Sequence, residues 1–272
     1  MNHFIDTACV NPWRNLALEE LLFERSLEGV CLYLWQNQNT VVIGRNQNAW
    51  KECRVEALEA AGGRLARRSS GGGAVFHDLG NLNFTFLTPR PAYDLHRQLG
   101  VVIGAVRSLG IEADFTGRND IVAANGSKFS GNAFMSPGSR HCHHGTLLIG
   151  ADTSSMAKYL SVSQDKLESK GVRSVRSRVV NLTELAPRIT VENMTEALFR
   201  AFGEEYGVTP ETMRVSGLDQ GLLDSLTEKF ASPEWRLESE PDFRFRRKQR
   251  FSWGGAELCL TVAHGRVADA RL

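Results

Sequence analysis

The chain has 272 residues, a formal net charge of +1, 42% hydrophobic residues and 23% charged residues, and this composition of an ordinary globular protein excludes disordered and fibrous classes. Because its 32 basic and 31 acidic residues nearly cancel, no overall field attracts nucleic acid or an anionic membrane, and an anionic ligand has to be held locally. The length accommodates one large domain with a small appendage.

We expect neither a targeting segment nor a membrane span in this sequence. No stretch approaches the roughly 18 apolar residues of a span, and the N-terminus has no basic start followed by an apolar run. We therefore expect a cytoplasmic protein, with an organelle matrix as the alternative. The five cysteines are scattered, odd in number and without CxxC spacing, which predicts reduced thiols and neither a disulfide framework nor a zinc ribbon.

Helices and short strands follow one another irregularly in the first part of the chain. Asn11 and Pro12 are typical of a helix start, and Gly62 and Gly110 of helix ends. The apolar patterns predict helices from Pro12 to near Gly29, over 55–61 and over 94–109, a hairpin over 31–44, and strands over 65–68, 73–77 and 82–87.

The middle of the chain predicts a tight hairpin, a strand and two helices. Asn125-Gly126 marks the turn of a hairpin over 121–134, with Lys128 just beyond the turn. Further along, the sequence predicts a strand over 143–151, a short helix capped by Thr153, a basic loop over 167–182, and a helix from Thr190 with apolar residues every fourth position at Met194, Leu198 and Phe202.

From about Thr209 the sequence changes in texture. A polar connector leads to a predicted helix and then to strands, as follows: a helix with Leu218, Leu222, Leu226 and Phe230, and strands over 243–245, 250–253, 256–263 and 266–272. Mixed helices and strands without strict alternation favour an α/β fold of mixed α+β type. We expect a main domain over 1–207, a linker and helix over 208–233, and a small unit over 234–272.

The most informative stretch is RRSSGGGAVFHD at 67–78, in which two arginines precede three glycines. Consecutive glycines let a backbone approach a ligand closely, and their N–H groups form an anion-binding concavity. The alternative is a glycine-rich turn with solvated arginines. The spacing is that of neither a Walker loop nor a Rossmann turn.

Two further stretches carry candidate chemistry. Lys128, flanked by small residues on a hairpin strand, can project a charge that steadies a phosphate or carboxylate oxygen, although an exposed lysine is the alternative. Asn119 and Asp120 either assist it or organise a turn. In HCHH at 141–144, neighbouring side chains face opposite sides of a strand, so we expect neither a shared metal nor a Cys-His nucleophile.

Taken together, these stretches resemble the lipoate-protein ligase A family of the biotin and lipoate protein ligase superfamily. The resemblance covers essentially the whole chain and rests on NPWRNLALEE, LYLWQNQNTVVIGRNQNAWKEC, ARRSSGGGAVFHDLGNLNFTF, GRNDI with the lysine hairpin, HHGTLLIGAD and KGVRSVRSRVVNLTEL. It implies a catalytic domain of mixed sheets and flanking helices with a small C-terminal accessory domain. Familiar members continue that domain with further helices, so we expect it to be partial here.

The family's implied reaction has two steps. With ATP and Mg²⁺, lipoate is activated to lipoyl-AMP, and the lipoyl group then passes to a lysine of apo lipoyl domains in E2 subunits of 2-oxoacid dehydrogenases or of the glycine-cleavage H protein. In some relatives the accessory domain is a separate polypeptide. Nucleic acid and membrane partners are not implied.

The resemblance also assigns roles to individual positions. It implies that Lys128 is the catalytic lysine between carboxylate and phosphate, and that Asp120 helps to hold Mg²⁺. The residues implied to bind ATP or the adenylate are Arg68, Gly73, Ala74, Val75, Phe76, Asn119, Asp120 and Lys128. Those implied to bind lipoate are Trp35, Ser70, His77, Lys128, Ala133 and His144, with Val42 and Gly131 as further walls of an apolar slot for the lipoyl tail.

Several alternatives remain open from the sequence. A lipoyltransferase that starts from lipoyl-AMP is not separated from a full ligase. A thioester transferase would need a cysteine before the lysine hairpin, where the sequence reads EADFTGRNDI. A non-catalytic binder is the third alternative. We also expect Arg140 and the basic residues over 170–178 to steer an acidic carrier.

Overall fold

The computed structural model describes residues 1–25, 28–116, 120–161, 179–238, 243–251, 253–263 and 266–272. Its core is an eight-stranded mixed sheet in the order β11-β1-β2-β6-β10-β9-β8-β7. The strands are β1 (His3–Asp6), β2 (Cys31–Trp35), β6 (Asn81–Pro89), β7 (Ala113–Thr116), β8 (Asp120–Ala123), β9 (Lys128–Met135), β10 (Arg140–Leu148) and β11 (Glu211–Thr212).

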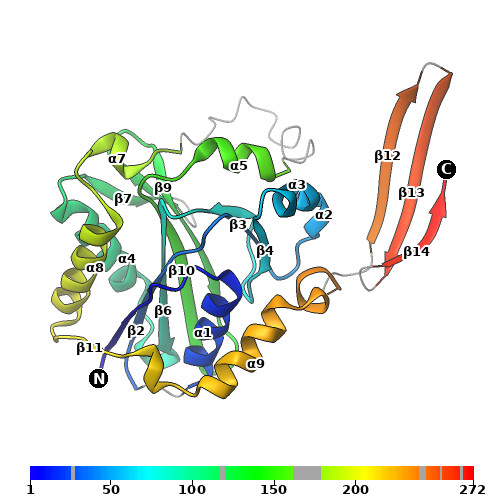
Figure 1. The fold of residues 1–272 in the computed structure, drawn as a ribbon. Helices are drawn as coiled ribbons and strands as arrows, with labels where there is room; N and C mark the ends of the chain where they lie inside the picture. Colours follow the sequence, from blue (N-terminus) through cyan, green and yellow to red (C-terminus); the bar gives the residue numbers. More distant parts are fainter. Residues whose placement is uncertain (26–27, 117–119, 162–178, 239–242, 252, 264–265) are drawn as a thin grey trace.

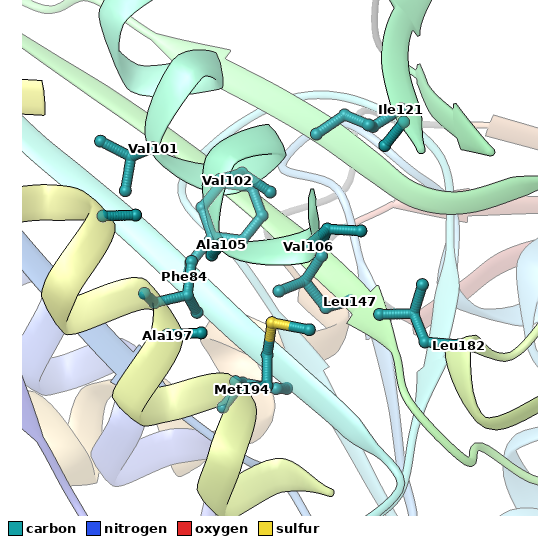
Figure 2. Packing of buried hydrophobic residues seen from close by; sticks show 14 of the residues in the cluster. Phe84, Val101, Val102, Ala105, Val106, Ile121, Leu147, Leu182, Met194 and Ala197 are labelled. Carbon is teal, nitrogen blue, oxygen red and sulfur yellow. The ribbon is translucent and has the colours of Figure 1, made fainter. Parts of the chain in front are cut away.

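Two long helices cover one face of this sheet. They are α4 (Leu95–Ser108), capped by Asp94, and α8 (Val191–Tyr206), which begins with a capping box between Thr190 and Asn193. Figure 2 shows side chains of both helices gathered around Phe84 of β6, among them Val102, Val106, Met194 and Ala197. This apolar layer confirms the predicted helices over 94–109 and from Thr190, because both bury a stripe at helical spacing.

The opposite face of the large sheet carries α1 (Pro12–Glu24) and a second, three-stranded sheet (Figure 1). The small sheet has the order β4-β3-β5 and consists of β3 (Thr40–Ile43), β4 (Arg64–Arg67) and β5 (Val75–His77). The short helices α2 (Ala49–Glu52), α3 (Val55–Ala60) and α5 (Thr153–Tyr159) lie beside it. The candidate site forms where this small sheet faces the large one.

The predicted hairpin over 31–44 is wrong. Strand β2 pairs with β1 and β6 in the large sheet, whereas β3 pairs with β4 and β5 in the small sheet. Every residue of both strands is buried, so each needs neighbours of its own on either side, and the chain crosses from one sheet to the other between them. The hairpin over 121–134 is confirmed by the antiparallel pair β8–β9.

The segment after α8 packs on the main body before it reaches the last sheet. Strand β11 joins the edge of the large sheet beside β1, and α9 (Gln220–Ala231) lies along α1 (Figure 1). The predicted apolar stripe is partly wrong, since Leu218 precedes the helix and Leu222 is exposed. Leu223, Leu226 and Phe230 form the buried face instead, because they share the side of the helix that faces α1.

The C-terminal residues form a third sheet in the order β12-β13-β14, with β12 (Phe243–Phe251), β13 (Gly254–Ala263) and β14 (Arg266–Arg271). Two predicted strands, over 243–245 and 250–253, are one continuous strand, because backbone pairing with β13 continues through the charged residues between them. Remaining elements are α7 (Leu182–Leu185) and single turns at 90–92, 215–217 and 234–238. No helix among the described residues is long and apolar enough to cross a bilayer.

Candidate active site

A cavity of about 370 Å³ lies between the two sheets. Its walls come from α1, from β5 and the glycine residues before it, and from β6, β9 and β10 of the large sheet. The predicted residues that line it are Trp35, Val42, Arg68, Gly73, Ala74, Val75, Phe76, His77, Asp120, Lys128, Gly131, Ala133 and His144. The fold thus gathers into one cavity residues that lie more than 100 positions apart in the sequence.

Among the described residues, one predicted site residue is not a cavity wall. Ser70 is buried behind the wall, but its hydroxyl lies 2.6 Å from Nε2 of His144, which does line the cavity. Asn119 and the basic residues over 170–178 lie outside the described residues. Arg140 donates to the backbone carbonyls of Phe23 and Arg25 at the end of α1, so its guanidinium caps that helix. The expectation that it steers a carrier stays a prediction.

Arg68 organises the glycine loop, which comprises residues 69–73. Its guanidinium donates to the carbonyls of Gly71 and Gly73, each at 2.8 Å, and to the Ser70 hydroxyl at 3.1 Å. Burial lowers the pKa of Arg68 to about 10, partly offset by the charge of Glu19, so the side chain remains charged at neutral pH. The loop is therefore held around a fixed positive charge at the cavity wall.

Glycine is required within this loop at Gly72. Its φ of +95° lies in the left-handed region, and a Cβ atom there would lie 2.8 Å from Nη2 of Arg68. By contrast, a Cβ atom on Gly71 or Gly73 would meet nothing within 4 Å. The close approach of backbone and guanidinium explains one of the three consecutive glycines.

Arg67 does not contribute its charge to the cavity. Its side chain is fully buried and donates to carbonyls of Gly44, Arg45, Gln47, Trp235 and Arg236. Neighbouring residues on a strand point to opposite faces, so Arg67 and Arg68 cannot both face the ligand. Arg67 instead ties the small sheet to the turn at 234–238.

Lys128 and Asp120 form an ion pair at the cavity, with 2.6 Å between Nζ and Oδ1. A register shift between Ile121 and Val122 in the β8–β9 pair places the two residues together, as bulges commonly re-aim a side chain. Gly131 leaves space for the lysine, since a Cβ atom there would lie 3.2 Å from Nζ. A cation and a carboxylate therefore face the same cavity.

The apolar part of the cavity is formed by Leu16, Trp35, Val42 and Val75, which belong to one hydrophobic cluster. Leu16 was not predicted as a wall, although it lies within the helix that was predicted from Pro12. Such a surface suits an aliphatic group, because burial removes the group from water.

His77 borders the cavity as a neutral side chain. Burial, together with the electrostatic effects of Arg68 and His144, lowers its pKa to about 3. The amide nitrogen of Asn37 lies 3.2 Å from Nδ1 of His77. Because the Asn37 oxygen accepts from Asn15, the nitrogen donates to Nδ1, and the imidazole proton resides on Nε2.

Glu19 is a functional candidate that the sequence analysis missed. Its carboxylate is buried and accepts from Nδ1 of His144 at 2.9 Å and from the Thr85 hydroxyl at 2.8 Å. Burial opposes ionisation of Glu19, but the interactions with His144, Thr85 and Arg68 together outweigh it, and the pKa lies below its usual value. The sequence did contain a signal for it, because Glu19 lies one turn after Leu16 on the apolar face of a predicted helix, and an acidic residue at a buried position is unusual.

The histidine run divides as predicted from strand alternation. His143 faces the core under α4 and bonds Gln98, whereas Cys142 and His144 face α1. The ligand atoms of Glu19, Cys142 and His144 lie within 4.8 Å of one another. Both nitrogens of His144 are already hydrogen-bonded and burial raises the pKa of the Cys142 thiol well above its usual value, so this cluster offers a cation little coordination.

Comparison with known proteins identifies the fold. The structure is similar to P. falciparum LipL1 in complex with lipoate, with 28% identity over 99% of this chain and 84% of that chain and a TM-score of 0.75. A bi-partite lipoate protein ligase from Thermoplasma acidophilum, solved with its E2 lipoyl domain, shares 27% identity over 86% of this chain and 95% of that chain, with a TM-score of 0.73.

A third similar structure is that of lipoate-protein ligase A bound with ATP, with 25% identity over 87% of this chain and 98% of that chain and a TM-score of 0.71. Residues 11–203 match the model of the lipoyl protein ligase A/B catalytic domain. This range contains the glycine loop, the Lys128–Asp120 pair and the cavity walls. The chain therefore belongs to the lipoyl protein ligase A/B catalytic-domain family.

Proposed function

We propose that the protein is an ATP-dependent lipoate-protein ligase. The observation that carries this proposal is a single cavity in which a cationic group, Lys128, and a glycine loop held by Arg68 share space with apolar walls. Such a cavity matches an acid with an aliphatic tail next to a phosphate. Similar structures contain lipoate or ATP, which supports both substrates.

In the proposed first step, the lipoate carboxylate attacks the α-phosphate of ATP, the bond to pyrophosphate breaks, and lipoyl-AMP forms. Both reacting groups are anionic, so Lys128 lowers their repulsion and stabilises the charge that develops on the phosphate. Arg68 and the backbone from Gly73 to Phe76 hold the nucleotide side. Trp35, Ala133 and the apolar walls hold the tail.

Asp120 fits the proposed Mg²⁺. It is the acidic residue among the described cavity walls, and Mg²⁺ is commonly held by one or two carboxylates together with substrate phosphates. When bound, Mg²⁺ would neutralise phosphate charge beside Lys128. Asn119 stays a proposed neighbour of this site.

In the proposed second step, the ε-amine of a carrier lysine attacks the acyl carbon of lipoyl-AMP and AMP leaves. The proposed carriers are apo lipoyl domains of E2 subunits and the H protein. The bi-partite relative solved with its E2 lipoyl domain supports this class of partner and a separate accessory protein as a further partner. The proposal includes a role in lipoate salvage in the cytoplasm, with residues 1–207 as the catalytic domain and 234–272 as an accessory unit after the 208–233 linker and helix.

A thioester route through a cysteine has less support. None of the five cysteines belongs to the cavity walls within the described part of the chain. Burial raises the pKa of Cys31 and Cys53 to about 12, which disfavours the thiolate that such a route needs.

One experiment distinguishes these activities. An apo lipoyl domain is incubated with the protein and either lipoate with ATP and Mg²⁺, preformed lipoyl-AMP, or octanoyl-carrier protein, and its mass is then measured. The proposal expects a lipoyl mass increase with the first two. Modification with lipoyl-AMP alone would assign a second-step transferase, and modification from the carrier protein alone a thioester transferase. No modification under any condition would favour a non-catalytic binder.

A further inference from the structure

Two chains of hydrogen bonds converge on one buried oxygen, Oε2 of Glu19. In the first, the indole Nε1 of Trp35 lies 3.0 Å from the Thr85 hydroxyl, which lies 2.8 Å from Oε2. In the second, Nε of Arg68 lies 3.1 Å from the Ser70 hydroxyl, which lies 2.6 Å from Nε2 of His144, and Nδ1 of His144 lies 2.9 Å from Oε2.

The chemistry of the end groups fixes the direction of the hydrogen bonds at those ends. Indole and guanidinium nitrogens only donate hydrogen bonds, so the hydroxyls of Thr85 and Ser70 accept from Trp35 and Arg68. An ionised carboxylate only accepts, so the Thr85 hydroxyl and Nδ1–H of His144 both donate to Glu19. The contact between Ser70 and Nε2 of His144 joins the two parts of the second chain.

Glu19 itself does not face the ligand space. Its side chain is 3% exposed and is not among the cavity walls, whereas the side chains that its two chains orient, Trp35 and His144, are walls. Leu16, one helical turn earlier on α1, is a wall of the apolar part. The Glu19 carboxylate thus connects Trp35, in the apolar part of the cavity, with His144, which contacts Ser70 of the glycine loop.

The arrangement of Ser70, His144 and Glu19 resembles a nucleophilic triad, but its geometry assigns it another role. Ser70 is 1% exposed and lies behind the cavity wall, so its oxygen cannot reach an acyl carbon in the cavity without movement of the glycine loop. The same oxygen already accepts from Arg68. A role in positioning neighbouring side chains requires neither access of Ser70 to the ligand nor a free Ser70 hydroxyl.

We propose that Glu19 is a positioning residue that holds Trp35 and His144 in the orientations that recognise the aliphatic tail of the acid substrate. This inference rests on the proposed function, because it presupposes an acid with such a tail. Without the carboxylate, the imidazole N–H of His144 loses its acceptor, and the Thr85 hydroxyl that accepts from the Trp35 indole loses the partner that orients it. Both walls can then rotate. The loss falls on tail recognition, whereas the backbone that faces the nucleotide keeps its own contacts through Arg68.

The test measures binding of hexanoate, octanoate and lipoate, and of ATP, by calorimetry to the full chain. Glu19→Gln removes the negative charge of the carboxylate that accepts the last hydrogen bond of each chain. Thr85→Val removes only the hydroxyl between Trp35 and Glu19. We expect Glu19→Gln to weaken lipoate binding about ten-fold and Thr85→Val about three-fold. We expect ATP binding to change less than about two-fold, and the gain in affinity from hexanoate to lipoate to shrink in both variants.

Two controls accompany these variants. Glu24→Gln changes an exposed carboxylate at the end of the same helix, and Thr85→Ser restores the hydroxyl, so both should bind lipoate as the unaltered chain does. Should Glu19→Gln fail to fold, the Thr85→Val and Thr85→Ser pair carries the test. Unchanged lipoate affinity in the folded variants, or an equal loss for all three acids and for ATP, would overturn the positioning role. Failure of the unaltered chain to bind any of the acids would instead overturn the proposed function and this inference with it.

Discussion

Nζ of Lys128 lies 2.6 Å from Oδ1 of Asp120 across the β8–β9 pair, and both side chains remain partly exposed to the cavity. The register shift in this pair brings the two residues together. A pair of this kind keeps the lysine at a defined place while no anionic ligand is present. A phosphate or carboxylate oxygen that enters the cavity competes with Asp120 for the same cation.

Replacement of this cation should abolish acid activation. We expect Lys128→Ala to reduce pyrophosphate release with lipoate, ATP and Mg²⁺ by at least about 100-fold, because two anions would then react without a fixed neutralising charge. Pyrophosphate release and thermal unfolding are measured on the same preparation, and the unfolding temperature should change little. Near-normal pyrophosphate release by a folded variant would remove Lys128 from the centre of the mechanism.

The glycine loop offers a matched pair of substitutions. Gly72→Ala places a Cβ atom 2.8 Å from Nη2 of Arg68 at a φ of +95°, whereas a Cβ atom on Gly71 meets nothing within 4 Å. We expect Gly72→Ala to weaken ATP binding by about ten-fold or more through displacement of Arg68, and Gly71→Ala to remain within about two-fold of the unaltered chain. Equal ATP affinities in calorimetry would show that the close approach has no role in binding.

Arg67 should act on stability. Its guanidinium joins the carbonyls of Gly44, Arg45 and Gln47 to those of Trp235 and Arg236. Arg67→Ala leaves these carbonyls without the guanidinium donor, and we expect the free energy of unfolding to fall by about 3 kcal/mol. Urea denaturation measures the change, with exposed Arg188→Ala as the control. A similar small effect of both substitutions would refute the tethering role.

Buried neutral histidines predict a loss of stability in acid. Burial lowers the pKa of both His77 and His143 to about 3, from 6.5 in the absence of the fold. Between pH 6.5 and 3 the unfolded chain therefore binds more protons than the folded one. The stability that the two histidines contribute by staying neutral is complete above pH 6.5 and disappears as the pH falls. In this range, each histidine makes the free energy of unfolding fall by about 1.4 kcal/mol for each pH unit by which the pH is lowered.

The measurement is the free energy of unfolding between pH 5 and 6.5. We expect His143→Gln to reduce the slope by one histidine's contribution, and His96→Gln, at an exposed position, to leave the slope unchanged. The same slope in all three proteins would mean that His143 titrates alike in the folded and unfolded chains.

Much of the local structure could be predicted from short-range patterns. The helices capped by Asn11, Asp94 and Thr190 begin where expected, because a cap depends on groups within a few residues. Thr153 was expected to cap α5, but Asp152 does so, since its carboxylate reaches the N–H groups of two residues of the first turn. Such errors of one residue arise where two adjacent side chains can both cap.

The sequence by itself determined the family, the glycine loop and the lysine hairpin, because these motifs consist of neighbouring residues whose chemistry is local. Only the tertiary structure decided that β2 and β3 belong to different sheets, that Arg68 faces the cavity while Arg67 ties down a distant turn, and that Glu19 connects Trp35 with His144. The physical reason is that a buried polar group must find its partner wherever the fold brings one within hydrogen-bonding distance. That partner lies 66 positions from Glu19 for Thr85 and 125 for His144.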